Sequence, residues 1–118
     1  MARLARVAVP GVPYHITHRG NRRSAVFYGE ADREIYLALL AGHGQKAGLD
    51  IWAWCLMTNH IHLIACPRRE DSMALALGRS HMQYARRINR QHGWCGHLWA
   101  NPTASRPPTQ GANGRGQH

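Results

Sequence analysis

Acidic residues are scarce in this sequence of 118 residues. It holds six Asp and Glu against 15 Lys and Arg, which gives a formal net charge of +9 at pH 7. Lys46 is the only lysine, so nearly all of the positive charge is arginine. Arginine binds phosphate through two parallel hydrogen bonds and stacks on bases, so this composition favours a nucleic-acid partner. A GC-rich genome, which favours arginine codons, is the alternative explanation.

Long apolar runs and paired cysteines are also missing. No run approaches the roughly 20 residues that cross a membrane, and the N-terminal stretch is a poor signal peptide. The three cysteines, Cys55, Cys66 and Cys95, are odd in number and include no Cys-x-x-Cys pair. This usage is typical of a reducing compartment, so we expect a cytoplasmic protein with no membrane partner.

Common catalytic patterns are missing as well. The sequence has no glycine-rich phosphate loop, no Ser-His-Asp set and no paired carboxylates. His92, Cys95 and His97 suggest a zinc site, but no fourth ligand has a suitable spacing. The candidate chemistry therefore lies elsewhere in the chain.

A His-x-His pattern is the most informative feature present. Residues 60–66 predict a strand, and strand side chains alternate between faces, so His60 and His62 point the same way. Their backbones would lie roughly 7 Å apart, which lets both imidazoles bind one divalent metal ion. Two half-buried histidines with ordinary hydrogen bonds are the alternative. The preceding Thr58-Asn59 predicts either a tight hairpin turn or a bulge.

The other elements follow from periodicity and turn residues. Residues 14–19 and 49–57 predict two further strands, and the second is apolar on both faces, which indicates a central position in the sheet. Helices are predicted over 31–47 and from 71 or 72 to about 92, each followed by a glycine. The resulting order is strand, helix, strand, strand, helix.

Two groups of arginines accompany these elements. The first group follows the first strand and consists of Arg19, Arg22 and Arg23. The second group lies along the second helix and consists of Arg79, Arg86, Arg87 and Arg90. Each group predicts a surface that binds a phosphate backbone, and an ordinary solvated surface is the alternative for each.

The C-terminal segment differs from the rest in composition. It is rich in glycine and proline and has almost nothing to bury. We therefore expect one domain over residues 1–101 and a disordered tail over 102–118.

Four motifs together resemble the single-tyrosine HUH transposases of bacterial insertion sequences, and most of all the REP-associated tyrosine transposases. The motifs are Pro-Tyr-His-Ile-Thr-His-Arg-Gly-Asn-Arg-Arg at 13–23, Asp-Arg-Glu at 32–34, Cys-Leu-Met-Thr-Asn-His-Ile-His-Leu at 55–63, and Tyr-Ala-Arg-Arg-Ile-Asn-Arg at 84–90 with Gly-His-Leu-Trp at 96–99. The resemblance runs in order over roughly residues 3–101. Four motifs in order are far more specific than His-x-His alone.

This resemblance implies a fold, a partner and a chemistry. The family fold is a ferredoxin-like α+β domain, with an antiparallel sheet and helices on one face. Family members bind single-stranded DNA beside a hairpin, and a tyrosine attacks the scissile phosphate to form a 5′-phosphotyrosine link. By the same resemblance, His60 and His62 would hold Mg²⁺ or Mn²⁺, with DNA oxygens and water completing the shell. A homodimer is a further possible assembly.

The sequence departs from the family pattern in one respect. The family's nucleophilic tyrosine lies on a later helix, in a Tyr-x-x-x-Asn or Tyr-x-x-x-Gln pattern whose last residue supplies a third metal ligand. Here the family pattern stops after Asn101, and no tyrosine follows Tyr84. Tyr84 is the remaining candidate nucleophile, but it belongs to a different motif and its helical stripe predicts a core position.

Three functions therefore stay open at the level of the sequence. The first is an enzyme that cuts and rejoins single-stranded DNA, and the second is a truncated, catalytically inactive module that binds single-stranded or hairpin DNA. The third is an RNA-binding domain of similar topology. The histidine pair disfavours the third, because sheets that bind RNA display aromatic side chains at such positions.

Overall fold

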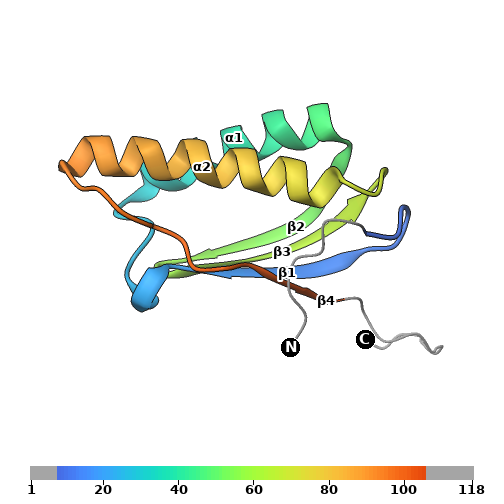
Figure 1. Cartoon of the computed structure of the whole chain (residues 1–118), viewed down its shortest axis with the longest axis horizontal. Coiled ribbons are helices and arrows are strands. Elements are labelled where there is room, and N and C mark those ends of the chain that lie inside the picture. Colours follow the sequence, from blue (N-terminus) through green and yellow to red (C-terminus); the bar gives the residue numbers. More distant parts are fainter. Residues whose placement is uncertain (1–7, 106–118) are drawn as a thin grey trace.

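The computed structural model describes residues 8–105, and residues 1–7 and 106–118 are outside this description. Two helices pack on one face of a four-stranded antiparallel sheet (Figure 1). The elements are β1 (Tyr14–Arg19), the 3-10 turn η1 (Asn21–Arg23), α1 (Glu30–Ala47), β2 (Leu49–Met57), β3 (His60–Pro67), α2 (Ser72–His92) and β4 (Thr103–Ser105). The predicted ferredoxin-like α+β fold with helices on one face is confirmed.

The strand order is β2-β3-β1-β4, which places β2 at an edge. The prediction that this strand is central was wrong. Its pairing with β3 shifts register between Ile51 and Ala53, which marks a bulge around Trp52. The side chains of Trp52 and Trp54 are 58% and 56% exposed, so the apolar residues that suggested two buried faces lie at the open edge.

The fourth strand lies in the segment that we expected to be disordered. Residues 103–105 pair antiparallel with β1, and Ala104 is buried. The prediction of disorder over 102–118 was therefore wrong for β4, because backbone pairing to an existing strand needs little apolar surface. The rest of that predicted tail, 106–118, lies outside the described residues.

The core lies between the helices and the covered face of the sheet. Alternate residues of β1 and β3, among them Ile16, Ile61 and Leu63, are almost fully buried. Tyr36 of α1 and Tyr84 of α2 are also fully buried, and for Tyr84 this confirms the core position that its helical stripe predicted. Because strand residues alternate, the intervening residues of β1 and β3 point to the sheet face that carries no helix. We call this second face the open face.

None of the described helices is both long and apolar enough to span a membrane.

Candidate functional site

The two histidines of the His-x-His pattern lie together on the open face of β3. Their neighbours Ile61 and Leu63 are buried under the helices, so His60 and His62 project in the opposite direction. The two ring centroids are 4.9 Å apart and the rings are nearly perpendicular, at 85°. Both side chains are half-buried, so the pair is accessible from the open face.

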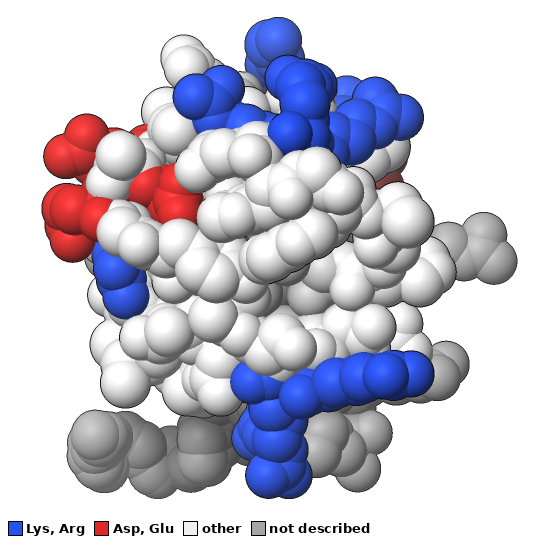
Figure 2. Space-filling view, turned by 90° about the vertical axis from the view of Figure 1, so that its left-hand side faces the viewer, with Lys and Arg blue, Asp and Glu red and all other residues white. Residues whose placement is uncertain are grey.

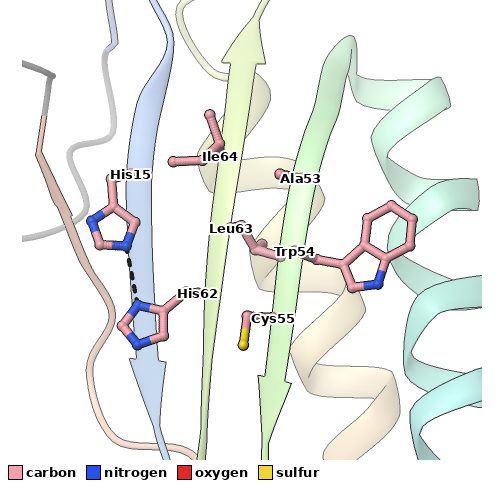
Figure 3. A pocket seen from close by; sticks show the side chains of 7 residues that line it. All are labelled: His15, Ala53, Trp54, Cys55, His62, Leu63 and Ile64. Carbon is pink, nitrogen blue, oxygen red and sulfur yellow. Dashed lines mark hydrogen bonds between the residues drawn. The ribbon is translucent and has the colours of Figure 1, made fainter. Parts of the chain in front are cut away.

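Hydrogen bonds orient both rings. Nδ1 of His60 lies 2.8 Å from Oδ1 of Asn59 and donates its proton to that oxygen. Nδ1 of His62 lies 3.0 Å from Nε2 of His15 (Figure 3). It also lies 3.3 Å from Oγ1 of Thr17. These contacts occupy the Nδ1 atom of each ring and leave both Nε2 atoms for a metal ion, an arrangement common among metal-binding histidines.

The charge state of His62 suits this role. Burial lowers the pKa of His62, and repulsion from His60, His15 and Arg19 lowers it further. The neutral imidazole is therefore favoured at neutral pH, and it is the form that binds metal ions.

The protein supplies only part of a metal shell at this position. A hollow of about 250 Å³ beside His62 is lined by largely apolar residues, including Ala53, Cys55 and Ile64 (Figure 3). Within residues 8–105, no group of three or more His, Cys, Asp or Glu is arranged to hold a metal ion. The histidine pair fits a divalent ion that takes its remaining ligands from DNA oxygens and water.

Sequence reasoning missed the residues that orient the pair. Strand alternation puts His15 and Thr17 on one face of β1, but nothing local indicated that β1 lies beside β3. In the structure Thr17 pairs with His62 across the two strands, which brings His15 onto the same histidine. The His15 and His62 rings stack with centroids 5.2 Å apart.

Asn59 connects the histidine pair to the first arginine group. Thr58 and Asn59 form the two-residue turn between β2 and β3, which resolves the choice between a turn and a bulge. The backbone carbonyl of Asn59 accepts the Gly20 N–H at 2.9 Å, and its side-chain amide donates to the Arg23 carbonyl at 3.3 Å. One residue therefore positions His60 and holds η1 beside it.

The first arginine group lies beside the histidines on a strained turn. Arg19 pairs with His60 across β1 and β3. Arg22 and Arg23 follow in η1 with φ angles of 56° and 60°, a left-handed conformation that costs a non-glycine residue about 1–2 kcal/mol. Gly20 opens the turn, and a Cβ there would lie 2.0 Å from the Ser24 carbonyl oxygen. Strained residues that the fold tolerates often serve binding.

Three members of the second arginine group, Arg86, Arg87 and Arg90, lie on the last two turns of α2, at the same end of the molecule as η1, whereas Arg79 lies in the first half of the helix. The four arginines of α2 in this group are all exposed, as are the three at η1 and the end of β1. Figure 2 looks at this end and shows basic side chains above, over α2, and below, over η1, with uncharged side chains between them. Acidic side chains lie to one side, at the start of α1.

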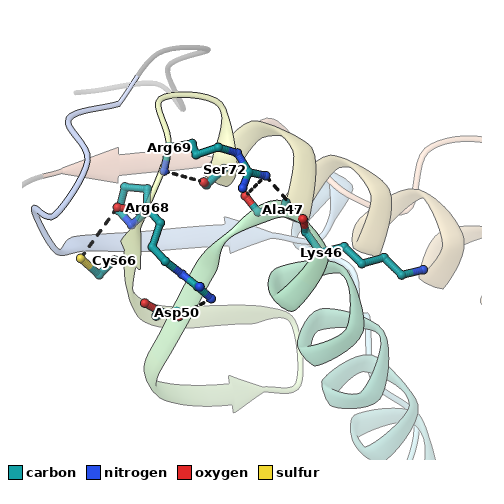
Figure 4. Close-up of polar contacts among 8 residues, drawn as sticks. Lys46, Ala47, Asp50, Cys66, Arg68, Arg69 and Ser72 are labelled. Carbon is teal, nitrogen blue, oxygen red and sulfur yellow. Dashed lines mark hydrogen bonds and ion pairs between the residues drawn. The ribbon is translucent and has the colours of Figure 1, made fainter.

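The arginines at the opposite end have structural partners. Arg68 forms an ion pair with Asp50 at 3.0 Å (Figure 4). Arg69 lies 3.7 Å from Asp71 and donates a hydrogen bond of 2.6 Å to the Ala47 carbonyl. In the described part of the chain, none of the seven arginines in the two predicted groups forms an ion pair. The two groups therefore have charge available for a polyanion.

Comparison with known proteins decides the family. The family model described as "Transposase IS200 like" matches residues 8–103. The chain belongs to the IS200-like transposase family. No curated protein sequence matches it.

Two solved structures are similar in fold to this IS200-like chain. One is a REP-associated tyrosine transposase bound to a REP hairpin, with a TM-score of 0.68, 16% identity and coverage of 92% of this chain. The other, from Deinococcus radiodurans R1, is assigned as a transposase and has a TM-score of 0.65, 21% identity and coverage of 90% of this chain and 86% of its own. The chain spans 64% of the length of the REP-associated transposase.

The tyrosines of this IS200-like domain do not lie with the histidines. Tyr84 donates a 2.6 Å hydrogen bond to the Val26 carbonyl, and burial raises its pKa well above the ordinary value. Tyr36 is buried on α1 and bonded to His81, and Tyr14 lies on the helix-covered face of β1. The sheet therefore separates these three phenols from the open face.

Two alternative sites from the sequence gain no structural support. His92, predicted as a weak zinc ligand with Cys95 and His97, stacks on Trp94 at 4.3 Å, and the described residues form no three-ligand group there. The open face of β1 and β3 carries histidines and Thr17 where RNA-binding sheets carry aromatic residues.

Proposed function

We propose that this chain binds single-stranded DNA beside a hairpin, as a DNA-binding domain for DNA transposition. The observation that carries the proposal is the position of six exposed arginines at the end of the domain that also carries the histidine pair: Arg19, Arg22, Arg23, Arg86, Arg87 and Arg90. Membership of the IS200-like family supports it, as does the likeness to a transposase bound to a REP hairpin. Phosphates of one bound strand can then contact both arginine groups and still reach the open face.

The histidine pair is proposed to hold Mg²⁺ or Mn²⁺. His60 and His62 would be the protein ligands through Nε2, and Asn59 and His15 would fix their orientation. Polarisation of a DNA phosphate is the chemistry that such an ion supplies when bound. The chain's own contribution is to orient two neutral imidazoles beside Arg19 and the strained turn.

Strand cleavage needs a nucleophile that this chain does not place beside its histidines. A phenol has a pKa near 10 and becomes a useful nucleophile only close to a metal-bound phosphate. Tyr84 is buried with a raised pKa, and Tyr28, the most exposed tyrosine, lies next to the C-terminal end of α2. We therefore propose that this chain, by itself, holds DNA without cutting it.

Location and assembly follow from the proposed partner. A DNA substrate and free cysteines at 55, 66 and 95 favour the cytoplasm. A homodimer stays a prediction, and light scattering with and without hairpin DNA tests it.

Addition of Mn²⁺ is expected to broaden the imidazole NMR signals of His60 and His62 before those of other histidines. The paramagnetic ion acts over a short distance, and His43, half-buried on α1, is the control. His15→Ala is expected to weaken Mn²⁺ binding about tenfold, because loss of an orienting partner typically costs a metal site 10- to 100-fold. Broadening of His43 with neither member of the pair affected would show that the site is wrong.

A further inference from the structure

A second hollow lies between η1 and the C-terminal end of α2. Its volume is about 410 Å³, within the range of small-ligand sites. Residues before α1 contribute Arg22, Ser24 and Tyr28 to its lining, and the end of α2 with the residues after it contributes Asn89 and Trp94. It is distinct from the hollow beside His62, whose lining residues come from β1, β2 and β3.

Exposed aromatic rings form one wall of this hollow. Trp94 is 49% exposed and Tyr28 is 45% exposed, and their ring centroids are 5.7 Å apart in an edge-to-face arrangement. His92 stacks behind Trp94 at 4.3 Å with an angle of 15° between the rings. The wall therefore presents aromatic surface to solvent, where a further flat ring can stack on it.

Backbone and side-chain hydrogen bonds hold this wall in place. The Trp94 N–H donates to the Asn89 carbonyl at 2.8 Å, and the Asn89 side chain donates to the Gly96 carbonyl at 3.1 Å. In the same wall, the Tyr28 N–H donates to Asp32 at 2.8 Å and the Tyr28 hydroxyl donates to the Ala25 carbonyl at 2.9 Å. These bonds fix the backbone from which Trp94 projects and both ends of the Tyr28 side chain, which lowers the entropic cost of binding.

The surrounding charge indicates what the hollow binds. Its lining residues come from η1, including Arg22, and from the C-terminal end of α2, and Figure 2 shows a band of uncharged side chains between the basic groups over these two elements. A strand whose phosphates contact both groups must pass across this band. Bases within a duplex stack on each other and offer only their edges, whereas an unpaired base exposes a face that can stack on an aromatic ring.

We propose that this hollow holds one unpaired base of the bound strand, stacked on Trp94 beside Tyr28. The proposal rests on the proposed function, because it names a subsite for the same DNA. Arg22 would contact the adjacent phosphate, and Ser24 and Asn89 would lie at the edge of the base. The site gives the domain a way to distinguish a hairpin with a single-stranded extension from a hairpin that ends at its last base pair.

The test compares two DNA hairpins, one with a single-stranded extension and one without. Trp94→Ala is expected to weaken binding of the extended hairpin by about 5- to 150-fold, the usual cost of losing one base-stacking side chain. Binding of the hairpin without an extension should stay unchanged. Trp94→Phe should retain most of the affinity because it keeps a ring. Trp52→Ala removes a tryptophan of β2 that is 58% exposed, more than Trp94, and this variant should bind both hairpins as the parent does.

A series of extended hairpins, each lacking one base, locates the stacked position. Removing the base that stacks on Trp94 is expected to weaken binding of the DNA by the parent. The same abasic DNA should bind to Trp94→Ala as tightly as the complete DNA does, because that variant has already lost the stacking ring. Equal binding of the extended hairpin by parent and Trp94→Ala would overturn the proposed subsite while leaving hairpin binding intact. Failure of the parent to bind either hairpin would overturn the proposed function itself, and the subsite with it.

Discussion

Replacing Arg22 and Arg23 together with alanine is expected to weaken hairpin binding about 25- to 60-fold at 0.1 M salt. Each lost phosphate contact removes roughly 0.7–0.9 from the slope of log affinity against log salt concentration, so the slope should flatten by about 1.4–1.8. Both side chains are exposed, and their turn is held beside His60 by Asn59. Binding titrations at several salt concentrations measure the affinity and the slope together.

Two further double substitutions, one on α2 and one at the opposite end of the domain, show whether the loss of affinity depends on where the arginines lie. Arg86→Ala with Arg90→Ala should have a similar effect, and all four changes together should weaken binding on the order of 1,000-fold. Lys46→Ala with Arg68→Ala also removes two positive charges, but at the end of the domain away from the proposed surface. Salt at 0.1 M screens charges over about 10 Å, so the affinity for DNA should stay nearly unchanged in this control. An equal loss in this control, or binding indifferent to salt, would remove the argument from arginine.

Acidification from pH 6.5 to pH 4 is expected to lower the free energy of unfolding by about 3 kcal/mol through His18. Burial lowers the pKa of His18 to about 4, although its Nε2–H donates to the Ala100 carbonyl. The unfolded chain takes up this proton near pH 6.5 and the folded chain only near pH 4. The contribution to stability is therefore complete above pH 6.5 and is lost as the pH falls toward 4, at about 1.4 kcal/mol per pKa unit.

The surroundings of His18 explain why its protonation is opposed. The rings of His81 on α2 and of Trp99 lie 4.3 Å and 4.8 Å away. Burial and the neighbouring His18 also lower the pKa of His81, and Arg86 lines the same hollow. A second positive charge in this cluster would meet both repulsion and the loss of water.

Urea unfolding at several pH values measures the free energy of unfolding of the parent and of variants. The carboxylates titrate alike in all of them, so the difference between parent and variant isolates the contribution of His18. His18→Gln can still donate to the Ala100 carbonyl but takes up no proton, so it should lose about 3 kcal/mol less than the parent over this range. His43→Gln, the same change on α1, should follow the parent. Equal losses in the parent and His18→Gln would contradict the proposed role of the buried imidazole.

The features that the sequence predicted depend on local patterns. The alternation of strand side chains placed His60 and His62 on one face, whatever the partner strand. Gly48 and Gly93 end the two helices with φ angles of 81° and 69°, a conformation that glycine adopts without strain. Such signals need only neighbouring residues, so they were visible before the fold was known.

The features that the sequence missed depend on which strands lie side by side. Apolar residues on both faces suggested that β2 is central, but the bulge around Trp52 and the exposed edge arise from its pairing with β3 alone. The short β4 exists through its pairing with β1. His15 likewise lies in the candidate site because of the pairing register between β1 and β3, and no local sequence pattern indicates that register.

A denaturing gel with labelled hairpin DNA and Mg²⁺ or Mn²⁺ tests the central claim most directly, with a native gel run in parallel. We predict a shifted band on the native gel and no covalent protein–DNA adduct on the denaturing gel, because the phenols of Tyr36 and Tyr84 are buried on the far side of the sheet from His60 and His62. An adduct that vanishes in Tyr84→Phe would contradict this account and identify Tyr84 as the nucleophile. An adduct that survives that change would contradict it equally and indicate Tyr28.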